Sequence, residues 1–287
     1  MRTKIKDWFE SRTGTLKSGD IGIEIEVEGK RIPTDLQDKA YKLWTITGDN
    51  SLRGGYEYVL RNPVKRNDVR SAIDLLIGEF KRCDSKINDS VRAGVHVHIN
   101  VQELYVVEVV NLMCLYYIFE ECLVDYCGES RVGNLFCLRV KDAKYMLKCL
   151  INILQNKRMS ELDSDDIRYA SMNLKALRRY GSIEFRSMRT PTDLSLIELW
   201  CNILIKLRDK AVVFNNPTEV IAEAQKGLDS FASFVFEDMY DELFKGDFDV
   251  SKLKHGLYNA QDIAYCTSWV GYDKASVNPF KKDGVKL

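Results

Sequence analysis

Four short segments of the chain carry acidic, imidazole, amide or guanidinium side chains between apolar ones, and in three of the segments these groups recur at every second position. The residues concerned are Glu24, Glu26, Glu57, His96, His98, Asn100, Glu184 and Arg186. Successive side chains of a β-strand point to opposite faces, so each segment, folded as a strand, shows these groups on one face and apolar residues on the other. Ordinary solvated faces carry Lys, Thr, Ser and mixed charges. The unusual composition therefore predicts a functional surface.

The chemistry of this set follows from its charge. If the four polar faces form one surface, their carboxylates converge, and two carboxylates ~4 Å apart repel by about 4 kcal/mol at an effective dielectric of 20. Such a cluster needs cations. Carboxylate oxygens suit Mg²⁺ or Mn²⁺, and Mn²⁺ accepts an imidazole more readily than Ca²⁺ does. Arg186 beside the cluster suits a phosphoryl group that gains charge in transfer. The residues predict metal-assisted phosphoryl chemistry.

The elements that position these side chains can be read from periodicity. Alternation predicts strands at Asp20–Glu28, Lys42–Thr47, Tyr56–Leu60, Gly94–Val101 and Ser182–Met188. Helical spacing predicts helices at Asp68–Cys83, Glu103–Cys127, Asp142–Asn156, Asp193–Phe214 and Glu219–Phe244. The strands do not alternate with single helices, so we expect an α+β class rather than a doubly wound α/β fold. We expect a curved, mainly antiparallel sheet with helices on its convex face and the polar cleft on its concave face.

Composition excludes several classes of protein. The 287 residues contain 42 Lys and Arg against 42 Asp and Glu, so no net charge favours nucleic acid or an anionic membrane. Eight cysteines without a C-x-x-C pair, and only three histidines, argue against a structural zinc site. The longest uncharged run of the most apolar stretch, Val109–Phe119, is too short to span a bilayer. With no linker and no signal peptide, a single cytoplasmic domain over residues 1–287 is expected.

At the polar segments the sequence resembles the amidoligases, which are ATP-dependent carboxylate–amine ligases of phages and bacteria with a glutamine synthetase-like catalytic fold. The matching segments are GIEIEVEG (22–29), GDNSLRGGYEYVLRNPV (48–64), AGVHVHIN (93–100) and RYASMNLKALRRYGSIEFRSMRT (168–190). They follow the family's order and lie within residues 22–190, while residues 191–287 add a mostly helical part without a motif. The resemblance implies that fold, a self-contained site, and the cytoplasm of a bacterium or a phage-infected host.

The resemblance also implies a metal centre for ATP with Mg²⁺, or Mn²⁺ in its place. Glu24 and Glu26 would bind two metals from one strand face. Glu57 would join one of them, and His96 and Glu184 would complete the other. The implied reaction has two steps. ATP phosphorylates a substrate carboxylate to an acyl phosphate, and an amine then forms the amide while water is kept out. The substrates would be a small-molecule or peptide carboxylate and an amine, with no nucleic acid and no membrane as partner.

Further roles follow from the same resemblance. The implied cofactor-binding residues are His98, Asn173, Arg178, Arg179 and Arg186. His98 would contact the ATP phosphates, and Arg186, with Arg178 or Arg179 nearby, would neutralise the transferred phosphoryl group. Asp49, near Ser51, would serve catalysis close to the amine or carboxylate substrate. Arg168 belongs to the matching segment without a defined role.

Two other functions remain open from the sequence. The spacing His96-x-His98-x₄-Glu103 mimics the first metal motif of a cupin, and His255-x₃-Asn259 mimics the second, although the Pro-x-Gly before the second is absent. A cupin-like or other metalloenzyme would need His255, whereas a ligase would not. A catalytically inactive protein that binds a nucleotide or a partner on the same fold is the other alternative. Neither a Walker A nor a G-x-G-x-x-G loop is present, so ATP would bind through metals and side chains.

Overall fold

The polar segments become neighbouring strands of one open antiparallel sheet in the computed structural model. The structure describes residues 4–8, 18–128, 131, 137–140, 144–156, 169–244 and 249–271. The strands are β1 (Ile21–Lys30), β2 (Trp44–Thr47), β3 (Gly55–Leu60), β4 (Lys86–Ile87), β5 (Gly94–Asn100), β6 (Met172–Asn173) and β7 (Ser182–Arg189). Their order is β2-β3-β1-β5-β7-β6, and β4 pairs with β1. The predicted α+β class and the antiparallel pairing are confirmed.

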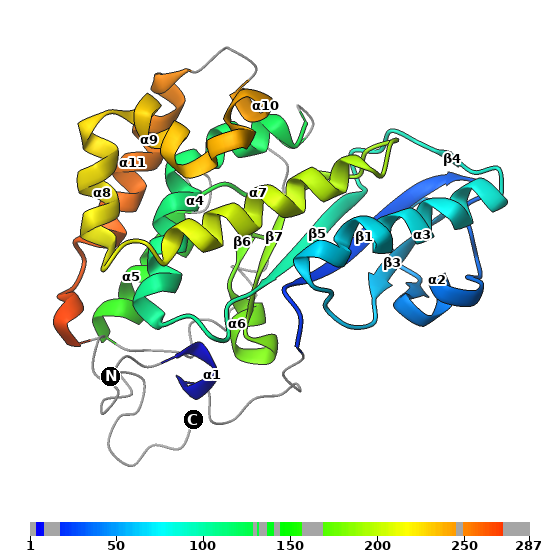
Figure 1. Cartoon of the computed structure of the whole chain (residues 1–287), viewed down its shortest axis with the longest axis horizontal. Helices are drawn as coiled ribbons and strands as arrows, with labels where there is room; N and C mark the ends of the chain where they lie inside the picture. The colour runs from blue at the N-terminus through cyan, green and yellow to red at the C-terminus, as the bar shows by residue number, and fades with distance from the viewer. Residues whose placement is uncertain are drawn as a thin grey trace.

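Helices make up most of the rest of the described chain (Figure 1). They are α1 (Ile5–Trp8), α2 (Asp38–Leu43), α3 (Val69–Arg82), α4 (Val106–Tyr126), α5 (Lys144–Asn156), α6 (Lys175–Tyr180), α7 (Leu196–Ala211), α8 (Pro217–Lys226), α9 (Leu228–Phe236), α10 (Tyr240–Phe244) and α11 (Val250–Ala264). Among the described residues, no helix combines the length and the apolar character needed to cross a membrane.

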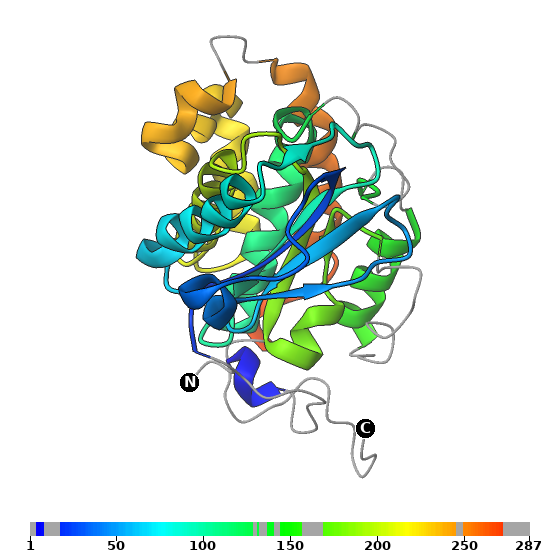
Figure 2. The ribbon, with the colours of Figure 1, turned by 90° about the vertical axis from the view of Figure 1, so that its right-hand side faces the viewer.

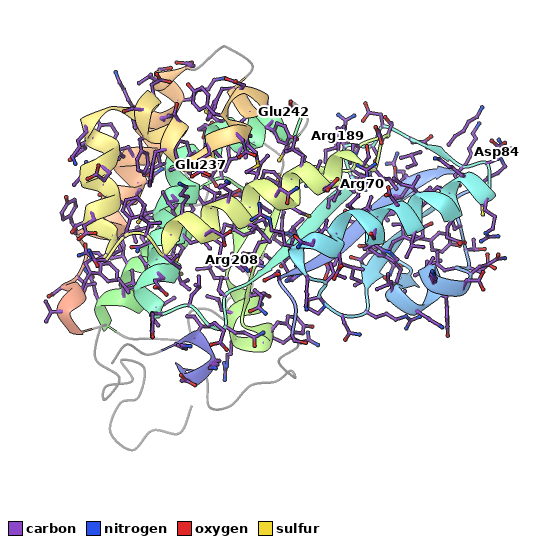
Figure 3. All side chains as sticks on the ribbon, viewed as in Figure 1. Arg70, Asp84, Arg189, Arg208, Glu237 and Glu242 are labelled. Carbon is purple, nitrogen blue, oxygen red and sulfur yellow. The ribbon has the colours of Figure 1, made fainter. Side chains whose placement is uncertain are left out.

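The two faces of the sheet differ in what covers them. Ile21, Ile23 and Ile25 of β1 are at most 1% exposed and point into the hydrophobic core. Helices α3, α4 and α7 lie on this side of the sheet (Figure 2), and Arg70 of α3 binds Glu198 of α7 at 3.1 Å (Figure 3). Burial of the isoleucines fixes the register, because a slip of one residue would turn them outward. The polar side chains are thereby held on the opposite face.

Helix α4 is apolar on all sides because the fold surrounds it. It contacts β7 on one side and α7, α8 and α11 on the others, and almost every residue from Val106 to Val124 is buried. Helix α11 approaches α4 very closely at Gly256, where a Cβ atom would lie 2.2 Å from the carbonyl oxygen of Tyr117. Only glycine fits such a contact. The apolar stretch is therefore a core helix.

The predicted elements hold with specific differences. The five predicted strands are confirmed, although residues 42–43 end helix α2 and β2 begins at Trp44. A single helix over Glu219–Phe244 is wrong, because Gly227 and Glu237 divide it into α8, α9 and α10. Glu237 has a φ of +48°, which a continuous helix does not allow. Helix α11 was not predicted, and Asp142 lies outside the described residues.

Candidate active site

Strand pairing brings the predicted polar side chains directly opposite one another. The cross-strand pairs are Glu26 with Glu57, Glu24 with His96, and His98 with Glu184. Directly opposed side chains on one face have Cβ atoms about 4.5–5.5 Å apart. The central strand β1 pairs with β3 on one side and β5 on the other. Residues from four separate sequence segments therefore form one continuous polar face.

Two groups of metal-binding atoms lie on this face, and Glu24 belongs to both. The first contains Glu24, Glu57 and His96, and the second contains Glu24, His98 and Glu184, with the donor atoms of each group within 4.8 Å of one another. The two oxygens of Glu24 point to different histidines, at 3.3 Å from His96 Nδ1 and 3.3 Å from His98 Nε2. These carboxylate-rich groups fit a pair of hard divalent ions bridged by one carboxylate.

This grouping agrees in part with the one that the resemblance implies. His96 stands with Glu57 and also lies 3.7 Å from Oε1 of Glu184, and His98 joins Glu184 as a further candidate ligand. Glu26 is in neither group. Its Oε2 accepts a hydrogen bond from the backbone N–H of Gly94 at 2.7 Å, and its Oε1 lies 3.9 Å from His96 Nε2. Glu26 therefore borders the first group.

Burial and charge shift the acidity of these groups in opposite directions. Burial opposes ionisation of Glu24, but hydrogen bonds to His96 and His98 outweigh it and hold the pKa of Glu24 well below its usual value. Burial and the neighbouring charge of Glu24 raise the pKa of Glu57. Burial disfavours the cationic form of His98, yet its bond to Glu24 raises the pKa of the imidazole. A divalent cation would favour the ionised form of Glu57.

Arg186 and Asn173 hold the carboxylate of Glu184 from two sides. Burial raises the pKa of Glu184, but the charges of Arg186, His98 and His96 together outweigh it, so the net shift is downward. Arg186 forms an ion pair with Oε1 of Glu184, and its Nη1 lies 3.4 Å from His96 Nδ1. Asn173 donates from Nδ2 to Oε2 of Glu184 at 2.7 Å. Asn173 therefore orients a candidate metal ligand, and Arg186 brings a positive charge to both ligand groups.

The remaining predicted residues lie outside the two ligand groups. Asp49 accepts a hydrogen bond from the backbone N–H of Ser51 at 2.7 Å, so its carboxylate stabilises a turn between β2 and β3. Arg178 and Arg179 occupy the last turn of α6. The guanidinium of Arg179 lies 5.0 Å from the centre of the Tyr180 ring. Arg168 lies outside the described residues.

A β-bulge in β7 shapes the far end of the polar face. Strand β7 has one more residue than β5 between the pairs Val95 with Met188 and Val97 with Phe185. The extra residue returns Met188 to the core, where it is 5% exposed. It also pairs Arg189 with Gly94, so that Arg189 follows Arg186 on the polar side. Alternation in the sequence alone does not reveal this change of phase.

Arg131 is a site residue that sequence reasoning missed. It is 2% exposed, and it donates from Nε to the carbonyl oxygen of Ser187 at 2.9 Å and from Nη2 to that of Arg186 at 2.7 Å. A Cβ atom on Gly94 would lie 2.9 Å from this Nη2 and 3.4 Å from Oε2 of Glu26. The guanidinium thus provides hydrogen-bond donors for the two carbonyl groups at the bulge, and it lies beside the polar face. No periodic pattern surrounds it in the sequence.

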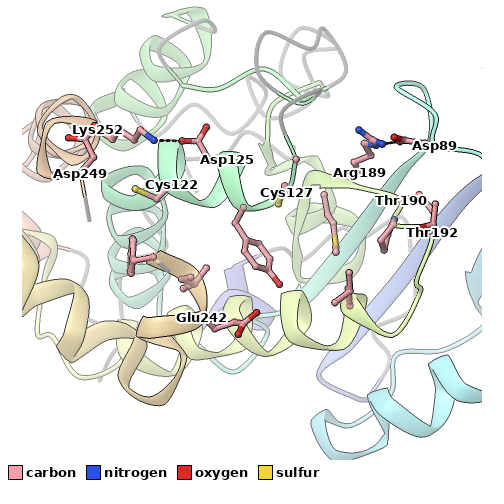
Figure 4. A pocket seen from close by; sticks show the side chains of 17 residues that line it. Asp89, Cys122, Asp125, Cys127, Arg189, Thr190, Thr192, Glu242, Asp249 and Lys252 are labelled. Carbon is pink, nitrogen blue, oxygen red and sulfur yellow. Dashed lines mark hydrogen bonds and ion pairs between the residues drawn. The ribbon is translucent and has the colours of Figure 1, made fainter. Parts of the chain in front are cut away.

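Two of the cavities among the described residues border the sheet in different ways. A cavity of about 240 Å³ includes Glu24 and His98 in its wall and so adjoins the second ligand group. A larger one of about 560 Å³ lies between the end of β7 and the helices, and Figure 4 shows Arg189 beside Asp89 and Lys252 beside Asp125 in its wall. Both cations form ion pairs there, and none of the candidate metal ligands lines this cavity.

The histidine spacing that mimics a cupin does not assemble as a cupin site. Glu103 accepts hydrogen bonds from Lys4 and Lys6 at 2.7 Å each, on an exposed part of the surface. His255 is exposed on α11 and belongs to neither ligand group. The described geometry therefore separates these two residues from the two clustered histidines.

Comparison with known proteins adds one finding. The family model described as "Putative amidoligase enzyme" matches residues 20–206, which is well over half of the chain. The matched segment runs from the start of β1 into α7 and contains both ligand groups. No curated protein matches the chain.

Proposed function

The chain belongs to the amidoligase family, and from this premise we propose that it joins a carboxylate to an amine in a reaction coupled to ATP cleavage. The observation that carries the proposal is the pair of ligand groups that share Glu24. Two divalent ions held by these groups would suit phosphoryl transfer, since they would neutralise charge on both the attacking and the leaving oxygens. Arg186 beside both groups supports the same assignment.

Glu24, Glu57 and His96 would hold one Mg²⁺, and Glu24, His98 and Glu184 the other. Mn²⁺ is the alternative ion because each group includes an imidazole. The ions would supply charge neutralisation for the phosphates of ATP. The protein keeps their ligands in place, since Asn173 holds Glu184.

In the first step, an oxygen of the substrate carboxylate attacks the γ-phosphorus of ATP, the bond to ADP breaks, and an acyl phosphate forms. Arg186 stabilises the charge that spreads over the phosphoryl oxygens. In the second step, the amine nitrogen attacks the acyl carbon, phosphate leaves, and the nitrogen loses a proton. A small-molecule or peptide acid and an amine fit this chemistry, and the absence of net charge does not favour a nucleic acid.

Glu24→Gln tests the proposal, with Glu103→Gln as the matched control on the surface. ATP at 100 times its Kd stabilises a protein by about 2.7 kcal/mol, a rise of several degrees in Tm for a chain of this size. We expect the rise to require both ATP and Mg²⁺, to vanish in Glu24→Gln and to persist in Glu103→Gln. Wild-type protein should then release phosphate with a matching acid–amine pair. An unchanged rise in Glu24→Gln would contradict the metal assignment.

A further inference from the structure

We propose that the cavity beside the second ligand group holds the nucleobase of the nucleoside triphosphate and recognises it by shape rather than by hydrogen bonds. This inference rests on the proposed function. The cavity, called here the base slot, has a volume of about 240 Å³. Its walls include Gly22, Val59, Leu60, Pro63, His98 and Tyr180. Whole-ligand pockets usually measure about 300–1,000 Å³, so the slot fits one part of a nucleotide.

The position of the slot is set by the strands. It lies at the Gly22 end of β1, next to Glu24 and His98, while Glu26 and Gly94 mark the other end of the polar face. Gly22 and Glu26 are four residues apart, roughly 13 Å along a strand. A triphosphate that lies along β1 between them would direct its nucleoside toward one of these two ends.

Charge distinguishes the two ends. At the Glu26 end, the buried Arg131 donates to neutral carbonyl groups among the described residues, so its positive charge offsets the neighbouring carboxylate of Glu26 and favours an anionic acid substrate there. The slot instead contains the carboxylates of Asp20 and Glu24. Its arginine, Arg61, donates to two backbone carbonyl oxygens and stacks 4.9 Å from the centre of the Tyr41 ring. A neutral flat ring fits this slot better than an anion does.

The shape of the slot also suits a ring. Val59, Leu60 and Pro63 form an apolar wall, and Tyr180 stands edge-on to His98 with ring centres 6.2 Å apart. Gly22 leaves the floor free of a side chain, because a Cβ atom there would lie only 3.3 Å from the Cβ of His98. Apolar and aromatic contacts hold a base without regard to its hydrogen-bonding edge.

Three polar residues of the slot already form hydrogen bonds within the protein. Asn100 donates to the carbonyl of Gly19 at 2.7 Å and accepts from the backbone N–H of Gln102 at 2.9 Å. Gln102 donates to the carbonyl of Tyr180, and Asp20 accepts from Arg208. A site discriminates strongly only where it is built to hydrogen-bond its ligand. We therefore expect adenine and guanine to bind similarly.

The first test measures binding to the full chain with Mg²⁺ by calorimetry, using ATP, GTP and tripolyphosphate. The Kd values for ATP and GTP should agree within about tenfold, and tripolyphosphate should bind roughly 5- to 150-fold more weakly, since it lacks a base. A preference above a hundredfold for one of the two nucleotides, ATP or GTP, would overturn the inference while leaving the ligase proposal intact. Tripolyphosphate binding as tight as that of ATP would do the same. If none of the three binds, the ligase proposal fails as well.

Variants of residues in the wall of the base slot test whether the slot causes the difference between nucleotide and tripolyphosphate binding. Val59→Ala removes part of the apolar wall of the slot, and Tyr180→Leu removes its aromatic edge. Val91→Ala is the matched control, because the side chain of Val91 is exposed and lies outside the slot. Both slot variants should weaken ATP and GTP binding at least about fivefold and leave tripolyphosphate binding unchanged, and the control should behave as wild type. Unchanged nucleotide binding, or an equal loss for tripolyphosphate, would overturn the assignment.

Discussion

Glu24 and Arg131 show how much of the candidate site depends on single side chains. Glu24 gives one oxygen to each histidine, and its lowered pKa keeps it ionised at neutral pH, as a bridging metal ligand must be. Arg131 donates hydrogen bonds to backbone carbonyl groups of β7 beyond its short pairing with β6, as the N–H groups of a neighbouring strand would do. Both residues act through geometry fixed by strands far apart in the sequence.

Arg131→Met should destabilise the protein and weaken metal binding together. Each buried carbonyl that loses its donor costs about 1–3 kcal/mol, so we expect the free energy of unfolding to fall by about 2–6 kcal/mol for the two carbonyls. Mn²⁺ affinity should fall at least tenfold, because Arg186 and Glu184 sit on the strand that Arg131 supports. Urea unfolding and Mn²⁺ electron paramagnetic resonance measure the two effects.

The control for Arg131 is Arg92→Met, an exposed arginine that donates to the carbonyl of Ser51. It should change stability by less than about 1 kcal/mol. Arg131→Lys keeps the charge but not the planar fork and should fall between wild type and Arg131→Met. Loss of stability with unchanged Mn²⁺ affinity would limit Arg131 to a structural role.

At the scale of elements, helix α4 is tied to the edge of the sheet by a buried carboxyl. Glu120 of α4 is 2% exposed, accepts from the hydroxyl of Ser171 beside β6, and accepts from the backbone N–H of Val140 at 2.9 Å. Nearby, Arg139 pairs with Glu121 at 2.6 Å. Burial raises the pKa of Glu120 to about 8, although its hydrogen bonds partly offset the effect. We therefore expect the stability of the contact between helix α4 and the sheet to depend on pH.

The sign of this dependence follows from proton linkage. Because the pKa of Glu120 is higher in the folded state than its ordinary value of 4.5, its contribution to stability is complete below about pH 4.5 and is lost as the pH rises to about 8. The loss amounts to at most about 5 kcal/mol. Glu120→Gln, which mimics the protonated acid, should lack this loss. Urea unfolding at pH 5 and pH 8.5 tests it, and equal pH dependence in both proteins would contradict it.

At the scale of the whole molecule, the helices after residue 191 complete the core that supports the sheet. Helix α7 contacts β5, α3 and α4, and Arg208 of α7 bonds to Asp20 at the start of β1 at 3.2 Å (Figure 3). Helix α11 packs on α4 through Gly256. The matched family segment ends inside α7, yet α4 needs α8 and α11 to bury its remaining sides.

We therefore expect residues 1–192 alone not to fold cooperatively. Removing α7 to α11 would expose the apolar sides of α4, and a large exposed apolar surface favours collapse and association. Near-ultraviolet circular dichroism and urea unfolding of this fragment, compared with the full chain, measure the effect. A cooperative transition in the fragment would indicate two independent domains, against the single domain expected over residues 1–287.

The sequence by itself determined the polar face and the chemistry open to it. Alternation with period two identified five strands and separated Glu24, His96 and Glu184 from their apolar neighbours, because burial of one face requires that pattern. The residue types then favoured hard cations and phosphoryl groups, although a cupin-like metalloenzyme and an inactive binding protein remained open. The fold class followed from the order of the strands and helices.

Only the tertiary structure decided which residues meet. Glu24 bridges two groups because β1 lies between β3 and β5, and His98 faces Glu184 across strands more than 80 residues apart. Arg131 enters the site from a segment without periodicity. Strand order, register and the bulge depend on contacts between distant segments, and local pattern carries no information about those contacts. The residue types therefore indicated the chemistry of the site, while packing determined which residues contact one another.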